Sequence, residues 1–178
     1  MTKIQAFPSL WLLSDERNDA VLGDALARLP RGSGFIYRHY HLPDPERWER
    51  FRALRHLALS RDHTVILADS ALTAREWGAH GIYGAPRSLY PQRGDLLQLA
   101  TAHDLREIAD AQRFGADAIL LSPAFPTNSH PGAPALGPTR FRLLAARACV
   151  PVIALGGMDE RRAARLDWPC WAAIDGLS

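Results

Sequence analysis

The sequence predicts an α/β protein folded as a (β/α)8 barrel, and three observations carry this prediction. Short apolar runs that suit buried strands alternate nearly eight times with segments of helical periodicity. Such alternation is typical of a parallel sheet, and eight units favour a closed barrel over an open, doubly wound sheet. The length of 178 residues suits one domain, and no linker or internal repeat interrupts it. We therefore expect a single barrel over residues 1–178.

The expected strands are the compact apolar runs that are bounded by turn-forming residues. They are residues 10–13, 35–37, 64–67, 81–83, 96–100, 118–121, 150–155 and 171–174. Helices are expected over residues 18–29, 44–60 and 71–77, and again after Asp104, Gly137 and Asp159. Asp44 before Pro45 is typical of an N-cap with proline at the first helical position. Thr101-x-x-Asp104 resembles a capping box.

Two helices of a complete barrel are weak or missing. Residues 84–94 carry no convincing helical pattern, so we expect the fourth helix to be weak, and no residues remain for an eighth helix. A missing outer helix leaves strands uncovered on one flank. We expect a partner subunit, as in a homodimer, or the N-terminal segment to cover that gap.

Composition and charge exclude several classes of function. The net charge is only +2 and the basic residues are scattered, so we expect neither a nucleic-acid partner nor a membrane surface. Lys3 is the only lysine, which leaves arginine for any bidentate phosphate contact in the interior of the chain. Cys149 and Cys170 form no disulfide framework and no zinc spacing, and there is no targeting segment or 18-residue apolar run. A cytoplasmic location is the resulting expectation.

A (β/α)8 barrel places its functional site at the carboxyl ends of its strands. The residues at those ends are polar and rich in phosphate and metal ligands. In chain order they are Ser14, Asp15, Arg38, His39, Asp69, Tyr83, Thr101, His103, the stretch from Ser122 to His130, Gly156, Gly157, Asp175 and Gly176. We include Ser122 and Gly176 among the residues expected to line a ligand site.

The segment from Ser122 to Gly137 is too long for a simple connection, and loops of this length are usually functional. Its four prolines fix φ and lower the entropy of the free loop, so the loop can hold a shape. It presents the hydroxyls of Thr127 and Ser129 and the imidazole of His130. We expect these groups to contact a ligand; the alternative is that His130 is an ordinary loop histidine.

Three further positions have both a functional and a structural interpretation. Gly156-Gly157 lies between a buried strand and a helix, which suits a phosphate held by backbone amides, or else a tight turn. Asp69 is either a Mg²⁺ ligand or a helix cap. Arg38 is either a pyrophosphate clamp or the partner of a neighbouring carboxylate. His39 and His41 have no third ligand at metal spacing, so we expect them either to be structural or to support residues that contact the ligand.

These residues resemble the thiamine phosphate synthase family and its relative, the thiazole tautomerase group. The resemblance runs from about Leu10 to Leu177. The chain is most similar to the divergent branch often fused to Nudix hydrolases, which has Ser-His-Pro-Gly where typical members have Thr-Lys. The matching motifs are Gly115-Ala116-Asp117, the loop from Ser122 to Ala133 and residues 153–157, followed by residues 10–15, Arg38, Asp69 and Thr101-Ala102-His103.

The resemblance implies a reaction as well as a barrel. Members of the family join hydroxymethylpyrimidine diphosphate to thiazole phosphate and release pyrophosphate, and Mg²⁺ with basic residues stabilises the leaving group. Carried over residue by residue, the implied roles are Mg²⁺ binding for Asp69, diphosphate contacts for Arg38 and Thr101, substrate orientation for Thr127 and Ser129, the place of the loop lysine for His130, and thiazole phosphate binding for Gly157.

The sequence departs from the family pattern at charged positions. The family's Gln-x-Arg-x-Lys reads Ile36-Tyr37-Arg38-His39-Tyr40, so a glutamine and a phosphate-binding lysine are absent. Ser88 lies near the place of the second Mg²⁺ aspartate, and Asp175 is an acid where an anion is expected. Pro123 stands where the tautomerase histidine is expected. Losing several charged hydrogen bonds, at roughly 1.5–3 kcal/mol each, would remove most of the activity.

Three functions follow from this resemblance, in order. The first is a thiamine phosphate synthase-like transferase that acts on small phosphorylated substrates. The second is a non-catalytic binding or regulatory protein whose ligand is thiamine phosphate or thiazole phosphate, and the third is a thiazole tautomerase-like activity. A requirement for Mg²⁺ and the release of pyrophosphate would separate the first function from the other two.

Overall fold

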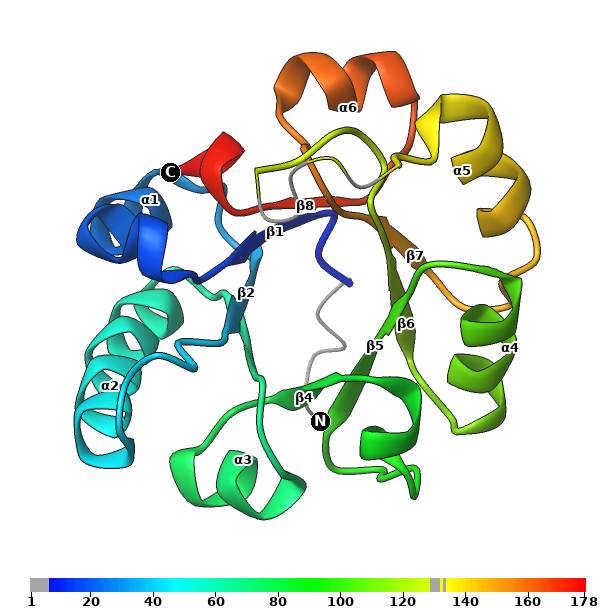
Figure 1. Ribbon diagram of the computed structural model, residues 1–178. Helices are drawn as coiled ribbons and strands as arrows, with labels where there is room; N and C mark the ends of the chain where they lie inside the picture. Colours follow the sequence, from blue (N-terminus) through cyan, green and yellow to red (C-terminus); the bar gives the residue numbers. More distant parts are fainter. Residues whose placement is uncertain (1–6, 129–131, 133) are drawn as a thin grey trace.

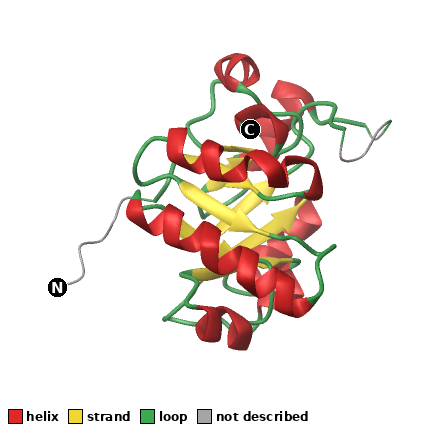
Figure 2. Cartoon of the chain, turned by 90° about the vertical axis from the view of Figure 1, so that its left-hand side faces the viewer, coloured by secondary structure: helices red, strands yellow, loops and turns green. Residues whose placement is uncertain are grey.

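The structure, a computed structural model, describes residues 7–128, 132 and 134–178. Eight parallel strands follow one another around a closed barrel, and β1 pairs with β8 to complete the ring (Figure 1). Helices surround the strands on the outside, as the side view shows (Figure 2). The described chain is therefore the predicted (β/α)8 barrel.

The elements alternate along the chain as the sequence predicts. The strands are β1 Leu10–Leu13, β2 Gly34–Tyr37, β3 Thr64–Leu67, β4 Gly81–Gly84, β5 Leu97–Ala102, β6 Ala118–Leu121, β7 Val152–Ala154 and β8 Trp171–Ala173. The α-helices are α1 Leu22–Arg28, α2 Asp44–Ser60, α3 Ala71–Trp77, α4 Leu105–Arg113, α5 Gly137–Ala145 and α6 Glu160–Leu166. Three 3₁₀ helices are η1 Glu16–Val21, η2 Pro86–Leu89 and η3 Asp175–Leu177.

Both predicted irregularities are present. Only the short η2 stands between β4 and β5 where the fourth helix would be, and only η3 follows β8. No helix among the described residues has both the length and the hydropathy needed to cross a membrane. The partner subunit that we expect to cover the flank without an outer helix stays a prediction.

Two predicted helix caps are wrong. Helix α2 begins at Asp44 itself, because the amide of Arg47 donates to the carbonyl oxygen of Pro43 and makes Pro43 the N-cap. The predicted capping box before α4 does not form, since Thr101 stays within β5. Instead, the Asp104 side chain accepts from the amide of Glu107 and is itself the N-cap. Pairing of β5 with β6 takes precedence over the local capping pattern.

The strands divide the core into two compartments because successive side chains point to opposite faces. Side chains that face outward pack against the helices, and the other set fills the inside of the barrel. The inner set is Trp11, Leu13, Ile36, Ile66, Leu99, Ala118, Leu120, Ile153, Cys170 and Ala172. The inside of the barrel is therefore a packed core, and a ligand has to bind at its rim.

Trp11 is the largest side chain inside the barrel, and Gly34 makes room for it. The two residues are register partners on β1 and β2, and Trp11 is fully buried. A Cβ atom at position 34 would lie 2.0 Å from the indole ring of Trp11. The indole nitrogen donates to the carbonyl oxygen of Pro8 at 2.8 Å, so the ring satisfies its only polar atom.

We expect Gly34→Ala to destabilise the barrel by about 1–3 kcal/mol, the usual cost of overpacking a filled core. Urea unfolding followed by tryptophan fluorescence measures this change. Gly94→Ala is the matched control, because a Cβ atom there meets nothing within 4 Å. Equal unfolding midpoints for the two variants would contradict this account of the core.

Candidate functional site

A cavity of about 560 Å³ opens at the carboxyl ends of the strands. Its walls come from the carboxyl-terminal residues of β4, β5 and β8 and from residues that follow β2, β5, β6, β7 and β8, so most of the barrel contributes to it. The residues that line it are Arg38, Tyr83, Thr101, His103, Ser122, Pro123, Pro126, Thr127, Asn128, Leu155, Gly156, Gly157, Met158, Asp159, Arg162, Ala173, Ile174, Asp175 and Gly176.

Seven of the ten predicted site residues line this one cavity: Arg38, Thr101, Ser122, Thr127, Gly156, Gly157 and Gly176. Asp69 is not among the lining residues. Ser129 and His130 lie outside the described residues. Because the site of such a barrel lies at the carboxyl ends of its strands, most of its predicted residues could be identified from the sequence alone.

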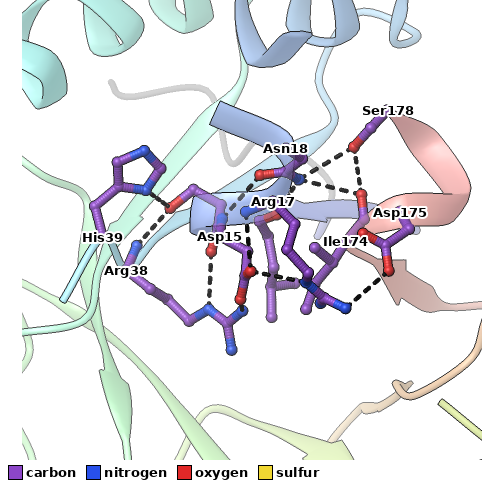
Figure 3. A network of polar contacts seen from close by, with 10 residues as sticks. Asp15, Arg17, Asn18, Arg38, His39, Ile174, Asp175 and Ser178 are labelled. Atoms are coloured by element: carbon purple, nitrogen blue, oxygen red, sulfur yellow. Dashed lines mark hydrogen bonds and ion pairs between the residues drawn. The ribbon is translucent and has the colours of Figure 1, made fainter. Parts of the chain in front are cut away.

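Arg38 follows β2 and is held by the end of β1 (Figure 3). Its Nε donates to the carbonyl oxygen of Ser14 at 2.9 Å, and its Nη2 donates to Asp15 Oδ2, also at 2.9 Å. The predicted pairing with a neighbouring carboxylate is therefore present, and Arg38 lines the cavity as well. A guanidinium has five N–H groups, so this pairing leaves donors for an anionic ligand.

The glycine pair after β7 allows the loop after β6 to lie against the strand end. Gly156 and Gly157 have φ values of 96° and 60°, in the region that favours glycine. A Cβ atom at position 156 would lie 2.7 Å from Pro123 Cα, and one at position 157 would lie 2.3 Å from the carbonyl oxygen of Pro126. The amide of Phe125 donates to the carbonyl oxygen of Gly156 at 3.0 Å. The predicted tight turn is thus real, and it forms one wall of the cavity.

Arg162 on α6 is a cavity residue that the sequence did not single out. Its Nη1 donates to the carbonyl oxygen of Gly157 at 2.5 Å, and its guanidinium lies 5.6 Å from the centre of the Phe125 ring. Asp159 caps α6 by accepting from the amide of Arg162 at 2.8 Å. These contacts place a second guanidinium beside the glycine pair. The sequence holds many arginines, and no local pattern distinguishes this one.

The acid at the end of β8 is neutralised by a neighbour. Asp175 Oδ2 lies 3.2 Å from Arg17 Nη1, and Arg17 Nε also donates to Asp15 Oδ1 at 2.9 Å (Figure 3). Asp175, Arg17, Asp15 and Arg38, in this order, therefore form one chain of alternating charges, and its two end residues line the cavity. Gly176 follows directly, and a Cβ atom there would lie 2.1 Å from the carbonyl oxygen of Met158.

Two more cavity residues, Tyr83 and His103, stand at strand ends that the sequence analysis named without assigning a role. Nδ1 of His103 lies 2.7 Å from Glu107 Oε2, one turn into α4. Burial raises the pKa of the Tyr83 phenol, so its hydroxyl is a donor at neutral pH. Both side chains add polar atoms to the cavity on the side of β4 and β5.

Asp69, the predicted Mg²⁺ ligand, is the counter-ion of a buried arginine. Its Oδ2 accepts from Arg47 Nη1 at 2.5 Å and its Oδ1 accepts from the amide of Ser70 at 2.6 Å. Ser70, not Asp69, caps α3. Arg47 is 6% exposed, and its side chain donates further to the carbonyl oxygens of Ala68 and Arg38.

This arrangement does not fit a Mg²⁺ ion at Asp69. Mg²⁺ takes oxygen ligands, usually one or two carboxylates with substrate phosphates. An ion at Asp69 would remove the counter-ion of Arg47 and place a divalent cation beside a buried guanidinium, which is costly. The described residues also contain no group of three or more His, Cys, Asp or Glu side chains placed to hold a metal. The Mg²⁺ requirement stays a prediction.

We expect the free energy of unfolding to decrease as the pH falls from 7 toward 5. Burial lowers the pKa of His39 and of His63 below the usual 6.5, and the Asp19 carboxylate opposes this shift at His39 without cancelling it. The unfolded chain then binds protons that the folded chain does not. Each such histidine removes about 1.4 kcal/mol per pH unit between its unfolded and folded pKa values. Urea unfolding at pH 7.5, 6.5 and 5.5 tests this prediction. A free energy of unfolding that increases as the pH falls from 7.5 to 5.5 would contradict it.

Comparison with known proteins places the chain in a family. Residues 13–167 match the family model described as thiamine monophosphate synthase. The chain is 41% identical over 132 residues, covering 68% of each chain, to a protein from Aquifex aeolicus named "Putative thiamine-phosphate synthase 2". It is 29% identical over 148 residues to the thiamine-phosphate synthase of Chloroflexus aurantiacus, covering 80% of this chain and 67% of that one.

Solved structures share the fold. A thiamine phosphate pyrophosphorylase from Pyrococcus furiosus superposes with a TM-score of 0.75 at 23% identity, over 93% of this chain and 85% of that one. A thiamine phosphate pyrophosphorylase from Bacteroides thetaiotaomicron superposes with a TM-score of 0.62 at 15% identity, over 94% and 82% of the two chains. The chain therefore belongs to the thiamine monophosphate synthase family.

Proposed function

We propose that this protein is a transferase of the thiamine phosphate synthase type, which joins hydroxymethylpyrimidine diphosphate to thiazole phosphate and releases pyrophosphate. The observation that supports this most is the gathering of Arg38, Thr101, Thr127 and the glycine pair around one cavity in a member of the family. The small phosphorylated substrates of the family suit a rim that carries two guanidinium groups.

The proposed reaction needs little covalent work from the protein. The bond between the pyrimidine methylene carbon and the diphosphate oxygen breaks, and its electrons leave with pyrophosphate. The thiazole nitrogen then shares its lone pair with the methylene carbon to form the new C–N bond. Catalysis consists of stabilising the leaving group and aligning the two substrates.

The residues divide these tasks between two sides of the cavity. Arg38 is suited to donate to the diphosphate, because Asp15 and Ser14 use only part of its guanidinium. Arg162 and the Gly156-Gly157 turn are suited to the phosphate of the thiazole on the other side. The hydroxyl of Tyr83 is a neutral donor that can contact either the leaving group or the pyrimidine.

A second candidate is a protein that binds a phosphate ligand without turnover, and the charge balance of the rim favours it. Arg38 and Arg162 are the two guanidinium groups among the described lining residues, and the carboxylates of Asp159 and Asp175 line the same cavity. A pyrophosphate leaving group with about three negative charges therefore meets little excess positive charge. The tautomerase-like alternative has no comparable support, because Pro123 lines the cavity where its base is expected.

We also propose that the protein is a cytoplasmic homodimer. Among the described residues only η3 follows β8, so the outer layer of helices is shorter on this flank and offers a place for a second subunit to pack. The sedimentation velocity of the purified chain measures its mass directly, and a monomer at micromolar concentration would contradict the dimer.

The decisive experiment is a turnover assay. Purified protein with both substrates and Mg²⁺ is expected to form thiamine phosphate, which oxidation converts to its fluorescent thiochrome derivative, while pyrophosphate appears in equal amount. A parallel reaction with chelator tests the Mg²⁺ requirement. Absence of product, together with thermal stabilisation by thiamine phosphate or thiazole phosphate, would favour the binding function instead.

We expect Arg38→Met to lower kcat/KM by about 10- to 150-fold, which corresponds to the loss of one charged hydrogen bond at roughly 1.5–3 kcal/mol. Arg75→Met is the matched control, because Arg75 pairs with Asp95 on the exposed surface and is not among the lining residues of the cavity. Equal kinetics of the Arg38 variant and the wild type would contradict the assigned role of Arg38.

A further inference from the structure

Arg38 is fixed by contacts on its backbone as well as on its side chain. Its amide donates to Ser14 Oγ at 2.7 Å, and its carbonyl oxygen accepts from Arg47 Nε at 3.2 Å. Its guanidinium bonds to the carbonyl oxygen of Ser14 and to Asp15, as described above. The hydroxyl of Ser14 is therefore one of the atoms that define where the arginine stands.

The same hydroxyl is held by His39, the next residue in the chain. Nδ1 of His39 lies 2.9 Å from Ser14 Oγ, and its Nε2 lies 2.7 Å from Asp19 Oδ1. A carboxylate only accepts, so in the neutral ring Nε2 carries the proton and Nδ1 accepts from the Ser14 hydroxyl. Ser14 Oγ is then left to accept from the Arg38 amide. Asp19, His39, Ser14 and Arg38 form one directed series of hydrogen bonds.

His39 is held in this place at a cost in backbone energy. Its φ is 36°, which is unusual for a residue other than glycine, and its side chain is 1% exposed. The imidazole stacks on the Tyr37 ring at 4.7 Å between centroids. Ser14 is fully buried, so without His39 its hydroxyl would lose its acceptor in a place that water does not reach. A strained residue that persists next to a site residue indicates a functional constraint.

We propose that His39 is a positioning residue, which orients the Ser14 hydroxyl and thereby sets the Arg38 guanidinium toward the anionic group of the ligand. The alternative is that His39 only fills space beneath the rim. The proposal rests on the proposed function in one respect, that Arg38 contacts a phosphate or diphosphate. The other part of the proposal, that the position of Arg38 depends on His39, does not depend on the proposed function.

Two substitutions of His39 test separately the two hydrogen bonds that its imidazole forms. Asparagine places an amide atom directly on Cγ, where the imidazole has Nδ1, and asparagine tolerates a positive φ. His39→Asn therefore keeps an acceptor for Ser14 and gives up the bond to Asp19. Glutamine places its amide one bond further out, so His39→Gln keeps the contact with Asp19 and gives up the one with Ser14.

The first readout is the Arg38 Nε–H signal in a ¹⁵N-resolved NMR spectrum, identified by its loss in Arg38→Lys. We expect this proton to exchange slowly with solvent in the wild type and in His39→Asn, and rapidly in His39→Gln. The second readout is the affinity for inorganic pyrophosphate, measured by calorimetry. We expect His39→Gln to bind roughly 10- to 100-fold more weakly, as a displaced binding group does, and His39→Asn to bind within a few-fold of the wild type.

His63→Asn is the control for the loss of a buried histidine. His63 is also 1% exposed, and its one hydrogen bond to the described residues is with the carbonyl oxygen of Leu26; it is not among the lining residues of the cavity. We expect it to lower stability while leaving the Arg38 signal and the pyrophosphate affinity unchanged. If His39→Gln does not fold, Ser14→Ala tests the same bond and is expected to give the same two losses.

The outcomes decide the proposal. Rapid exchange in His39→Gln together with slow exchange in His39→Asn supports it. Slow exchange in both variants, or rapid exchange in both, would overturn it, because Nδ1 would then not be the atom that matters. Failure of the wild type to bind pyrophosphate would count against the proposed function alone, since the exchange of the Arg38 signal would still test the positioning role.

Discussion

Closure of the barrel between its first and last strands is the constraint on which the site depends. Residues 10–12 of β1 pair with residues 171–173 of β8, and the buried side chain of Asn18 reinforces that junction. Its amide nitrogen donates to the carbonyl oxygens of Leu13 and Ile174 at 3.0 and 3.1 Å, and also contacts Ser178 Oγ (Figure 3). One buried amide thereby binds the end of β1 to the last residues of the chain, in the place where a complete barrel has a helix. Without closure, the strand ends would not converge on one cavity.

The rim above this junction is built from paired charges. Each guanidinium that lines the cavity has acceptors from the protein: Asp15 and Ser14 for Arg38, and Gly157 for Arg162. Such pairing holds an arginine in one geometry before a ligand arrives, which lowers the entropy lost on binding. It also reduces the net positive charge that a diphosphate would meet. The pairing therefore orders the arginines and weakens their attraction for a diphosphate. The balance of these two effects determines whether the protein catalyses the reaction or only binds its ligand.

The sequence predicted the architecture well because buried parallel strands read as short apolar runs. The runs at residues 10–13, 64–67 and 118–121 are strands with the predicted bounds, and α2 and α3 also cover the predicted residues. Errors occurred at element ends, where several local hydrogen bonds compete. Thr101 had the spacing of a capping box, yet pairing with β6 kept it in the sheet. At α3, Ser70 is the N-cap, which leaves Asp69 to pair with Arg47.

The sequence by itself determined the barrel, its two weak helices, and the strand ends at which Arg38, Thr101 and Gly156-Gly157 stand. These features depend on periodicity and turn chemistry, which act between residues close in the chain. Only the tertiary structure decided that Arg47 forms an ion pair with Asp69 and that Arg162 donates to the glycine pair. It also decided that the His39 ring forms hydrogen bonds with both Ser14 and Asp19. The choice of a hydrogen-bond partner depends on distance in space, and 22 positions separate Arg47 from Asp69 in the chain. Local patterns carry no information about such pairs.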